Sequence, residues 1–92
     1  MNVYAVEYSY AAAPASLDQH RPAHRAFLRS LVPEFLVVAG AYQSGDMPGA
    51  LLVVRAPDTS QVERTLDADP FNIQGLITSR TIRLWNPAIG SI

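Results

Sequence analysis

The stretch FLVVAGAYQSGDMPGALLVVRA, residues 35–56, decides the fold of this chain. Its two ends, 35–42 and 49–56, are runs of apolar and β-branched residues, and the loop over 43–48 between them has the Ser-Gly-Asp composition of a turn. Short apolar runs bounded by turn residues are typical of strands that bury both faces. We therefore predict two consecutive strands at the centre of the chain. In the first, strict alternation would place on one face Phe35, Val37, Ala39 and Ala41.

The segment before this stretch predicts a strand and a helix. Residues 3–10 alternate in character, which indicates a first strand. A connection over 11–16 follows, and Ser16-Leu17-Asp18-Gln19 has the form of a capping box, so that a short helical turn can start there. Proline suits the first position of a helix better than its interior, so Pro22 is expected to begin a separate helix that ends at Pro33. The apolar stripe of that helix comprises His24, Phe27, Leu28 and Leu31.

The segment after the central strands predicts a second helix and a last strand. Asp58 or Ser60 is expected to cap the helix, since both residue types accept hydrogen bonds from the first turn. Pro70 disfavours helical geometry at Asp69 and should end the helix there. A short connector then leads to a strand over 76–85, and the tail over 87–92 is expected to be loose.

The predicted order is β-α-β-β-α-β, which is the ferredoxin-like arrangement of the α+β class in a single domain over residues 1–92. In this fold a four-stranded antiparallel sheet carries two helices on one face. The central strands are apolar on both sides, so the opposite face of the sheet needs a partner. We therefore predict a homodimer that packs through the open sheet face.

Composition excludes several classes of protein. The net charge is −1 with seven arginines and no lysine, which argues against a nucleic-acid partner. Three arginines, Arg21, Arg25 and Arg29, share one helical line, for which a solvated helix face is the simplest interpretation. The absence of cysteine excludes disulfides, thiolate catalysis and cysteine-bound zinc. No secretion signal and no apolar run long enough to span a membrane is visible, so we expect no membrane partner and a cytoplasmic protein.

His24 and Asp69 are the residues best suited to chemistry. Histidine exchanges a proton near neutral pH, and a carboxylate bonded to one ring nitrogen selects the tautomer, as in hydrolase triads. Each residue also has a structural interpretation: His24 as a core histidine bonded to a backbone carbonyl, and Asp69 as the cap of a helical turn that begins at Pro70. His20 is expected to be solvated. No metal site is predicted, because His20 and His24 lack a third ligand, and no cofactor is expected.

Several short motifs in a fixed order resemble those of the YCII-like family, and the resemblance extends from Val3 to about Pro87. It implies a dimeric α+β barrel and a histidine–aspartate dyad in a pocket, at positions that match His24 and Asp69. At least one family activity is the dehydrochlorination of a chlorinated hydroxyquinol, which is an acid–base elimination. The chain departs from the family at Ala41, where a proline is common, and at Pro33-Glu34, where a glycine is usual. The matching motifs are Arg21-Pro22-Ala23-His24, Ala39-Gly40, Asp67-Ala68-Asp69-Pro70-Phe71, Gly75 and Ile82-Arg83-Leu84-Trp85.

Two functions follow from these observations. The first is a small cofactor-free enzyme, a lyase or isomerase acting on a small cyclic or aromatic compound, with His24 as general acid and base and Asp69 as its orienting partner. The second is a non-catalytic dimeric protein that binds a small molecule or acts as an accessory. In either case Arg21 is a candidate contact for an anionic group. Candidates to line a pocket for a flat ring, or alternatively to form core or interface, are Tyr8, Tyr42, Phe71 and Trp85.

Overall fold

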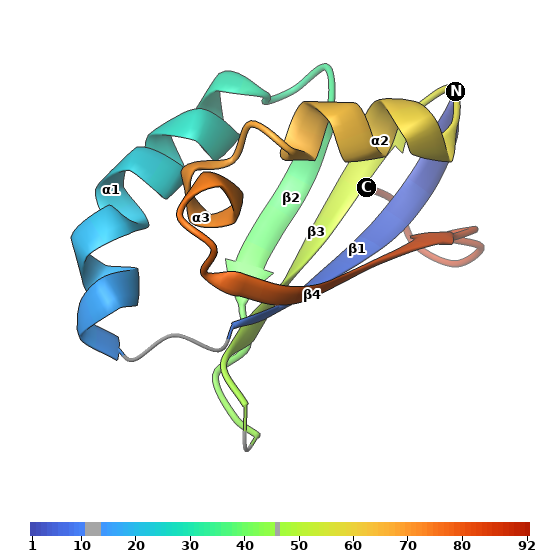
Figure 1. Cartoon of the computed structure of the whole chain (residues 1–92). Helices are drawn as coiled ribbons and strands as arrows, with labels where there is room; N and C mark the ends of the chain where they lie inside the picture. Colours follow the sequence, from blue (N-terminus) through green and yellow to red (C-terminus); the bar gives the residue numbers. More distant parts are fainter. Residues whose placement is uncertain (11–13, 46) are drawn as a thin grey trace.

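The computed structural model describes residues 1–10, 14–45 and 47–92 and confirms the ferredoxin-like order (Figure 1). Parts of the predicted connection over 11–16 and of the loop over 43–48 therefore lie outside the described residues. A short helix follows the second one and begins at Pro70, where the sequence offered Asp69 as a cap. The elements are β1 (Asn2–Tyr10), α1 (Pro14–Ser30), β2 (Leu36–Ala41), β3 (Gly49–Ala56), α2 (Thr59–Leu66), α3 (Pro70–Ile73) and β4 (Ile77–Leu84).

The four strands form one antiparallel sheet in the order β2-β3-β1-β4. Tyr8 of β1 pairs with Ala50 on one side and with Arg80 on the other, so these three side chains share a face of the sheet. That face carries the core beneath the helices. Its largest buried members from β1 and β3 are Tyr4, Val6, Tyr8, Tyr10, Leu52 and Val54.

One expectation for β2 is wrong because the strand contains an irregularity. Its register against β3 shifts between Leu36 and Val38, so the alternation does not continue through this point. Leu36 pairs with Val54 and is buried in the core, on the same face as Ala39. Beyond the shift, Val38 pairs with Val53 on the open face.

The predicted helix break at Pro22 is also wrong, because α1 continues from Pro14 to Ser30 with Pro22 inside it. Proline removes one backbone hydrogen bond from the interior of a helix. Leu17, His24 and Leu28 lie at spacings of seven and four and are all buried. Packing of this one face against the sheet and α3 therefore holds both parts of α1 in a single helix.

The helix ends elsewhere follow the predicted capping. Asp58 caps α2, and its side chain accepts a hydrogen bond from the backbone N–H of Gln61 at 2.8 Å. Asp69 ends the connection after α2 and begins α3, with Pro70 at the first helical position.

The face of the sheet opposite the helices carries no helix of the described chain. Its exposed apolar side chains include Val38, Leu51 and Trp85.

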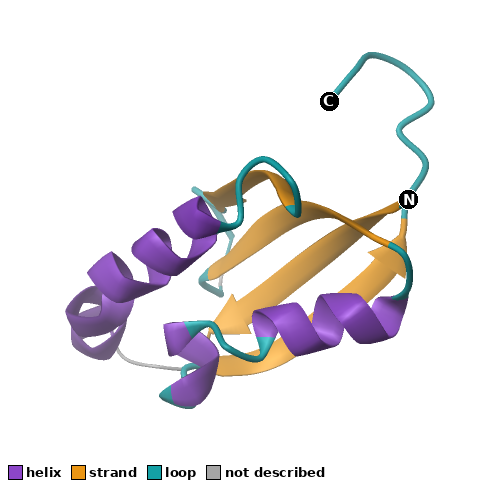
Figure 2. Cartoon of the chain, turned by 90° about the horizontal axis from the view of Figure 1, so that it is seen from above, coloured by secondary structure: helices purple, strands orange, loops and turns teal. Residues whose placement is uncertain are grey.

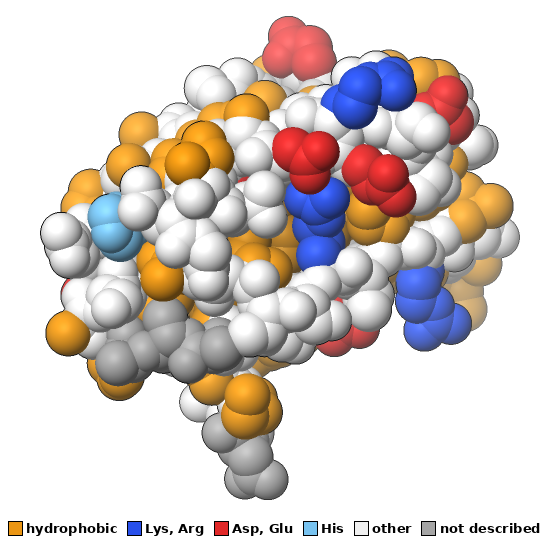
Figure 3. All heavy atoms as spheres, viewed as in Figure 1, with side chains coloured by type: hydrophobic (Ala, Val, Ile, Leu, Met, Phe, Trp, Pro, Cys, Tyr) orange, Lys and Arg blue, Asp and Glu red, His pale blue; other side chains and the backbone are white. Residues whose placement is uncertain are grey.

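After β4 the tail extends as a loop away from the helices (Figure 2). On the helical side, acidic and basic side chains alternate over α2 and toward β4 (Figure 3). None of the described helices combines the length and apolar character needed to cross a membrane.

Candidate active site

Asp69 lies at the junction of α2 and α3, where local sequence fixes its backbone. Its main-chain N–H donates to the carbonyl of Leu66 at 3.0 Å, and its side-chain Oδ1 accepts from the backbone N–H of Phe71 at 2.9 Å. Pro70 supplies a pre-organised first helical residue. The predicted capping role of Asp69 is therefore confirmed, and the side chain is fully buried.

His24 approaches this carboxylate from the buried face of α1. Its Nδ1 lies 2.8 Å from Oδ1 and 3.0 Å from Oδ2 of Asp69. The imidazole ring stacks on the ring of Phe71, with centroids 3.9 Å apart and planes within 3° of parallel. The prediction that the fold brings His24 and Asp69 together is thus confirmed, and the backbone-carbonyl interpretation of His24 is wrong.

This geometry distinguishes the two ring nitrogens of His24. A carboxylate only accepts hydrogen bonds, so Nδ1 carries a proton that it donates to Asp69. In the neutral ring, Nε2 is then unprotonated and has a free lone pair. The residue is 7 % exposed and lines a cleft, so Nε2 is the nitrogen available to a small molecule.

Tyr8 supports the carboxylate from the sheet. Its hydroxyl donates to Oδ2 of Asp69 at 3.2 Å, and its ring is almost completely buried. Burial, followed by the negative charge of Asp69 and the hydrogen bond to it, raises the pKa of Tyr8 well above its usual range. Tyr8 therefore remains a neutral donor. Asp69 thus accepts hydrogen bonds from His24 of α1, from Tyr8 of β1 and from the backbone N–H of Phe71.

A second set of contacts anchors the loop that carries Asp69. Arg80 of β4 binds the carboxylate of Asp67 with its Nη2 2.8 Å from Oδ1, and Asn72 donates to the carbonyl of Asp67 at 3.1 Å. Arg80 is also the cross-strand neighbour of Tyr8. The loop is therefore tied to the same part of the sheet that supports the carboxylate.

The cleft beside His24 lies between α1 and the edge of the sheet formed by β2 and β3. Its volume is about 170 Å³. Arg21 lines it, as predicted for a candidate anion contact, and so does Arg25, which the sequence assigned to a solvated face. The other lining residues are Tyr10, Leu28, Ala39, Gly40, Ala41, Ala50 and Leu52.

Sequence reasoning missed Tyr10 as a cleft residue. The signal was present, because Tyr10 shares the inward face of β1 with Tyr8 and stands at the end of the strand nearest to α1 in the chain. Tyr8 and Phe71, predicted to line the pocket, lie behind the His24–Asp69 pair and are 1 % and 0 % exposed. They contact the pair and do not line the cleft.

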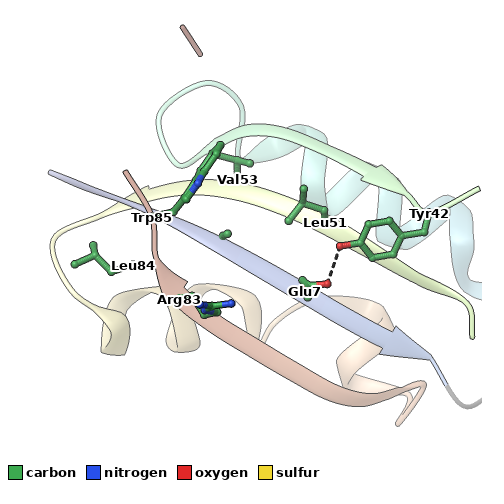
Figure 4. Close-up of a pocket in the computed structure, with 8 residues that line it drawn as sticks. Glu7, Tyr42, Leu51, Val53, Arg83, Leu84 and Trp85 are labelled. Carbon is green, nitrogen blue, oxygen red and sulfur yellow. Dashed lines mark hydrogen bonds between the residues drawn. The ribbon is translucent and has the colours of Figure 1, made fainter. Parts of the chain in front are cut away.

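Tyr42 and Trp85 lie on the other face of the sheet and not beside His24. They line a separate, larger cavity of about 380 Å³ together with Leu51 and Val53 (Figure 4). The Tyr42 hydroxyl donates to Glu7 at 2.8 Å, and this hydrogen bond raises the pKa of Tyr42. The larger cavity contains no histidine and lies on the open face, so its size does not make it the better candidate for acid–base chemistry.

The comparisons with known proteins agree with this fold. A family model described as a YCII-related domain matches residues 1–86. The chain belongs to the YCII-related family. The matched part of the chain includes both His24 and Asp69. A search of curated proteins found no match.

Solved structures with the same fold extend the comparison of this YCII-related chain. A 5-chloro-2-hydroxyhydroquinone dehydrochlorinase from Burkholderia phenoliruptrix AC1100, in complex with 2,5-dihydroxybenzoquinone, is 22 % identical with a TM-score of 0.69, over 91 % of this chain and 93 % of that one. An uncharacterised NIPSNAP domain protein from Burkholderia xenovorans is 18 % identical with a TM-score of 0.56, over 96 % and 95 %. An antibiotic biosynthesis monooxygenase is 13 % identical with a TM-score of 0.59, over 97 % and 100 %. At these identities the likeness establishes the fold.

The sequence predicted no metal site at His20 and His24. Among residues 1–10, 14–45 and 47–92, no three histidine or acidic side chains gather as a metal site would require. His20 and His24 now lie on one continuous helix, since α1 is unbroken at Pro22. Both oxygens of Asp69 are already occupied by hydrogen-bond donors of the protein.

Proposed function

We propose that this protein is a cofactor-free enzyme of the lyase or isomerase type that acts on a small cyclic or aromatic compound. His24 serves as its general base and general acid. The observation that supports this most strongly is the geometry of one ring: Nδ1 of His24 contacts both oxygens of a fully buried carboxylate, while the same ring lines a cleft. Asp69 orients the ring and stabilises the imidazolium that forms when Nε2 accepts a proton.

The number of hydrogen bonds to Asp69 supports more than a capping role. A helix cap requires one side-chain oxygen and one backbone N–H, as Asp58 shows at the start of α2. Asp69 additionally receives His24 and Tyr8, and it is buried, where an ionised group is stable only with several donors. Such an arrangement fixes the tautomer and the orientation of the imidazole, as acid–base catalysis requires.

The cleft and the structural comparison together suggest which compounds to test first. A cleft of about 170 Å³ suits a single ring with a few substituents. The similar dehydrochlorinase acts on a chlorinated hydroxyhydroquinone and binds a dihydroxybenzoquinone. We therefore propose hydroxylated and halogenated ring compounds, with elimination and tautomerisation as the first reactions to assay.

Nitrogen-15 NMR of the histidine rings tests the dyad without any substrate. We expect His24 to show a protonated Nδ1 and an unprotonated Nε2 at pH 8, and the Asp69→Asn variant to lose this single-tautomer pattern. His20, which is half-buried on the same helix and outside the cleft, serves as the internal control, and His20→Gln assigns its signals. A mixed tautomer for His24 in the wild type would remove the basis of the proposal.

Activity then separates the proposal from its alternative, a binding or accessory protein. The low exposure of His24 favours that alternative, because a nearly buried ring can serve to order a cleft. We expect His24→Asn to abolish turnover while the fold and ligand binding survive. If the wild type binds ring compounds from the screen but converts none of them, the binding protein becomes the better description.

We also propose that the chain forms a homodimer through the open sheet face and works in the cytoplasm. The dimer is supported by the exposed apolar side chains on that face, which include Val38, Leu51 and Trp85. Exposure of such a surface to water is unfavourable in free energy, and a partner chain would bury it. The cavity lined by Tyr42 and Trp85 would then lie at the dimer interface and not at the dyad.

A further inference from the structure

Tyr10 occupies a position beside the proposed dyad that no role yet explains. It is the last residue of β1, it is 5 % exposed, and it lines the same cleft as His24. Its ring packs in a T-shaped arrangement with Phe71, with centroids 5.4 Å apart and planes at 82°, while His24 stacks parallel to Phe71. Phe71 thus holds both side chains, and packing defines the position of each at the cleft.

The hydroxyl of Tyr10 differs from those of the other tyrosines. Tyr8 donates to Asp69, Tyr42 donates to Glu7, and the hydroxyl of Tyr4 accepts from Asn2. Within the described ranges, the Tyr10 hydroxyl makes no hydrogen bond to another residue. Tyr10 lines the cleft, where its hydroxyl can donate a hydrogen bond to a ligand.

The charges around Tyr10 make it a donor that stays protonated. Burial and then the carboxylate of Asp69 raise the pKa of Tyr10 to about 12, and Arg21 acts in the opposite direction. Arg21 lines the cleft too, and one of its nitrogens, Nη2, lies 3.2 Å from Asp18. A guanidinium has five N–H donors, so Arg21 keeps others for a ligand.

We propose that the Tyr10 hydroxyl, assisted by the positive charge of Arg21, donates a hydrogen bond to the carbonyl or phenol oxygen attached to the ligand's ring. It thereby selects compounds in which this oxygen carries negative charge. This inference deepens the proposed function and rests on it. Nε2 of His24 takes a proton from a ring carbon next to a carbonyl. The electrons of the broken C–H bond form a C=C bond, and those of the C=O bond move to oxygen, which Tyr10 and Arg21 stabilise. The substrate class is therefore a ring carbonyl or phenol that passes through an enolate or phenolate.

The probe for this site is 4-nitrophenol, because its absorbance reports directly how much of the bound compound is phenolate. A hydrogen bond to a charged group changes a free energy by about 1.5–3 kcal/mol, which corresponds to about one to two pKa units. We expect the pKa of 4-nitrophenol to fall by about one unit on binding to the wild type. In Tyr10→Phe this shift should largely disappear, and the affinity for the phenolate should fall by about tenfold.

Two controls separate the hydroxyl from general effects on the cleft. Nitrobenzene has the same ring without the phenol oxygen, and its affinity should be equal for the wild type and Tyr10→Phe. Arg29 lies one turn beyond Arg25 and lines a neighbouring cavity that lacks His24, so Arg29→Ala should leave the shift in place. Arg21→Gln, at a half-buried position of α1, removes the positive charge and should reduce the shift as a second variant.

Two results would overturn the inference: an unchanged phenolate affinity in Tyr10→Phe, or no binding of 4-nitrophenol to the wild type at millimolar concentration. The NMR experiment on the tautomer of His24 uses no ligand, so failure of the dyad is detected separately. If the tautomer is as expected and Tyr10→Phe has no effect, only the role of Tyr10 is lost. If the tautomer is mixed, the proposed function fails on its own evidence.

Discussion

At the scale of the residue, Asp69 has two structural tasks that are normally separate. It begins α3 as a cap, and it receives the side chains of His24 and Tyr8 from a different helix and from the sheet. The first task is local and is visible in the sequence Asp-Pro. The second joins residues 45 positions apart, so only the fold establishes it.

Asp69 and Asp58 allow the two tasks to be measured separately, because both cap helices and only Asp69 is buried. Asp58→Ala should lower the free energy of unfolding by about 1 kcal/mol, the usual value of a cap. Asp69→Ala should lower it by about 3–5 kcal/mol, because it leaves buried donors without their acceptor. Urea unfolding of both variants gives the comparison. Equal losses would mean that Asp69 is only a cap.

The buried tyrosines predict how stability depends on alkaline pH. The pKa of Tyr8 and that of Tyr10 are raised in the folded protein, from an ordinary value of about 10. The folded state therefore holds these protons more tightly than the unfolded state. Their contribution to stability is complete below about pH 10 and is lost as the pH rises through about 12, the value for Tyr10.

Urea unfolding between pH 8 and pH 11.5 tests this dependence. The free energy of unfolding should be nearly constant up to about pH 10 and then fall, since tyrosine ionises above that pH in the unfolded chain. The decline should be shallower in Tyr8→Phe, which has one ionisable group fewer. The same slope in the variant and the wild type would show that Tyr8 does not contribute.

At the scale of the element, α1 shows where sequence reasoning reached its limit. The stripe of His24, Phe27 and Leu28 correctly predicted which face of the helix is buried. The break predicted at Pro22 does not occur in the structure. The packing of Leu17 and His24 on either side of Pro22 stabilises the helix more than the low helix propensity of proline destabilises it. The register shift in β2 was missed for a related reason, since it depends on pairing with β3 and not on the apolar run itself.

Pro22 therefore offers a direct measurement of what the packing of α1 overcomes. An interior proline costs a helix about 3 kcal/mol relative to alanine. Pro22→Ala should stabilise the protein by about 1–3 kcal/mol, because it restores a backbone hydrogen bond in an otherwise unchanged helix. Pro14→Ala is the matched control: Pro14 is the first residue of α1, where proline is tolerated, and its replacement should change little. A destabilised Pro22→Ala would contradict this account.

At the scale of the whole molecule, the sheet has one covered face and one open face, and the sequence predicted both. The evidence was that the strands over 35–42 and 49–56 are apolar on both sides, while the sequence predicted two helices, which can cover one face. What covers the open face is a property of an assembly, so the structure of one chain leaves the homodimer a prediction.

Leu51 tests that prediction. A charge at the centre of a buried apolar interface is unfavourable, so Leu51→Glu should convert a dimer to a monomer in light scattering at micromolar concentration. Ile73, an exposed apolar residue of α3, lies outside the open face and provides the control: Ile73→Glu should leave the dimer intact. A wild-type protein that is already monomeric would refute the proposed assembly.

The edge strand beside the cleft has a consequence for how such a protein can diversify. Ala39, Gly40 and Ala41 line the cleft but take no part in holding His24 and Asp69. Ala39 and Ala41 pair with Leu52 and Ala50 of the helix-covered face, so their side chains point to the cleft, and larger residues at these two positions would narrow it. Mutation along this strand can therefore resize the cleft step by step while the proton-transfer groups stay unchanged. Selection for a new compound can act on one short strand and need not rebuild the protein.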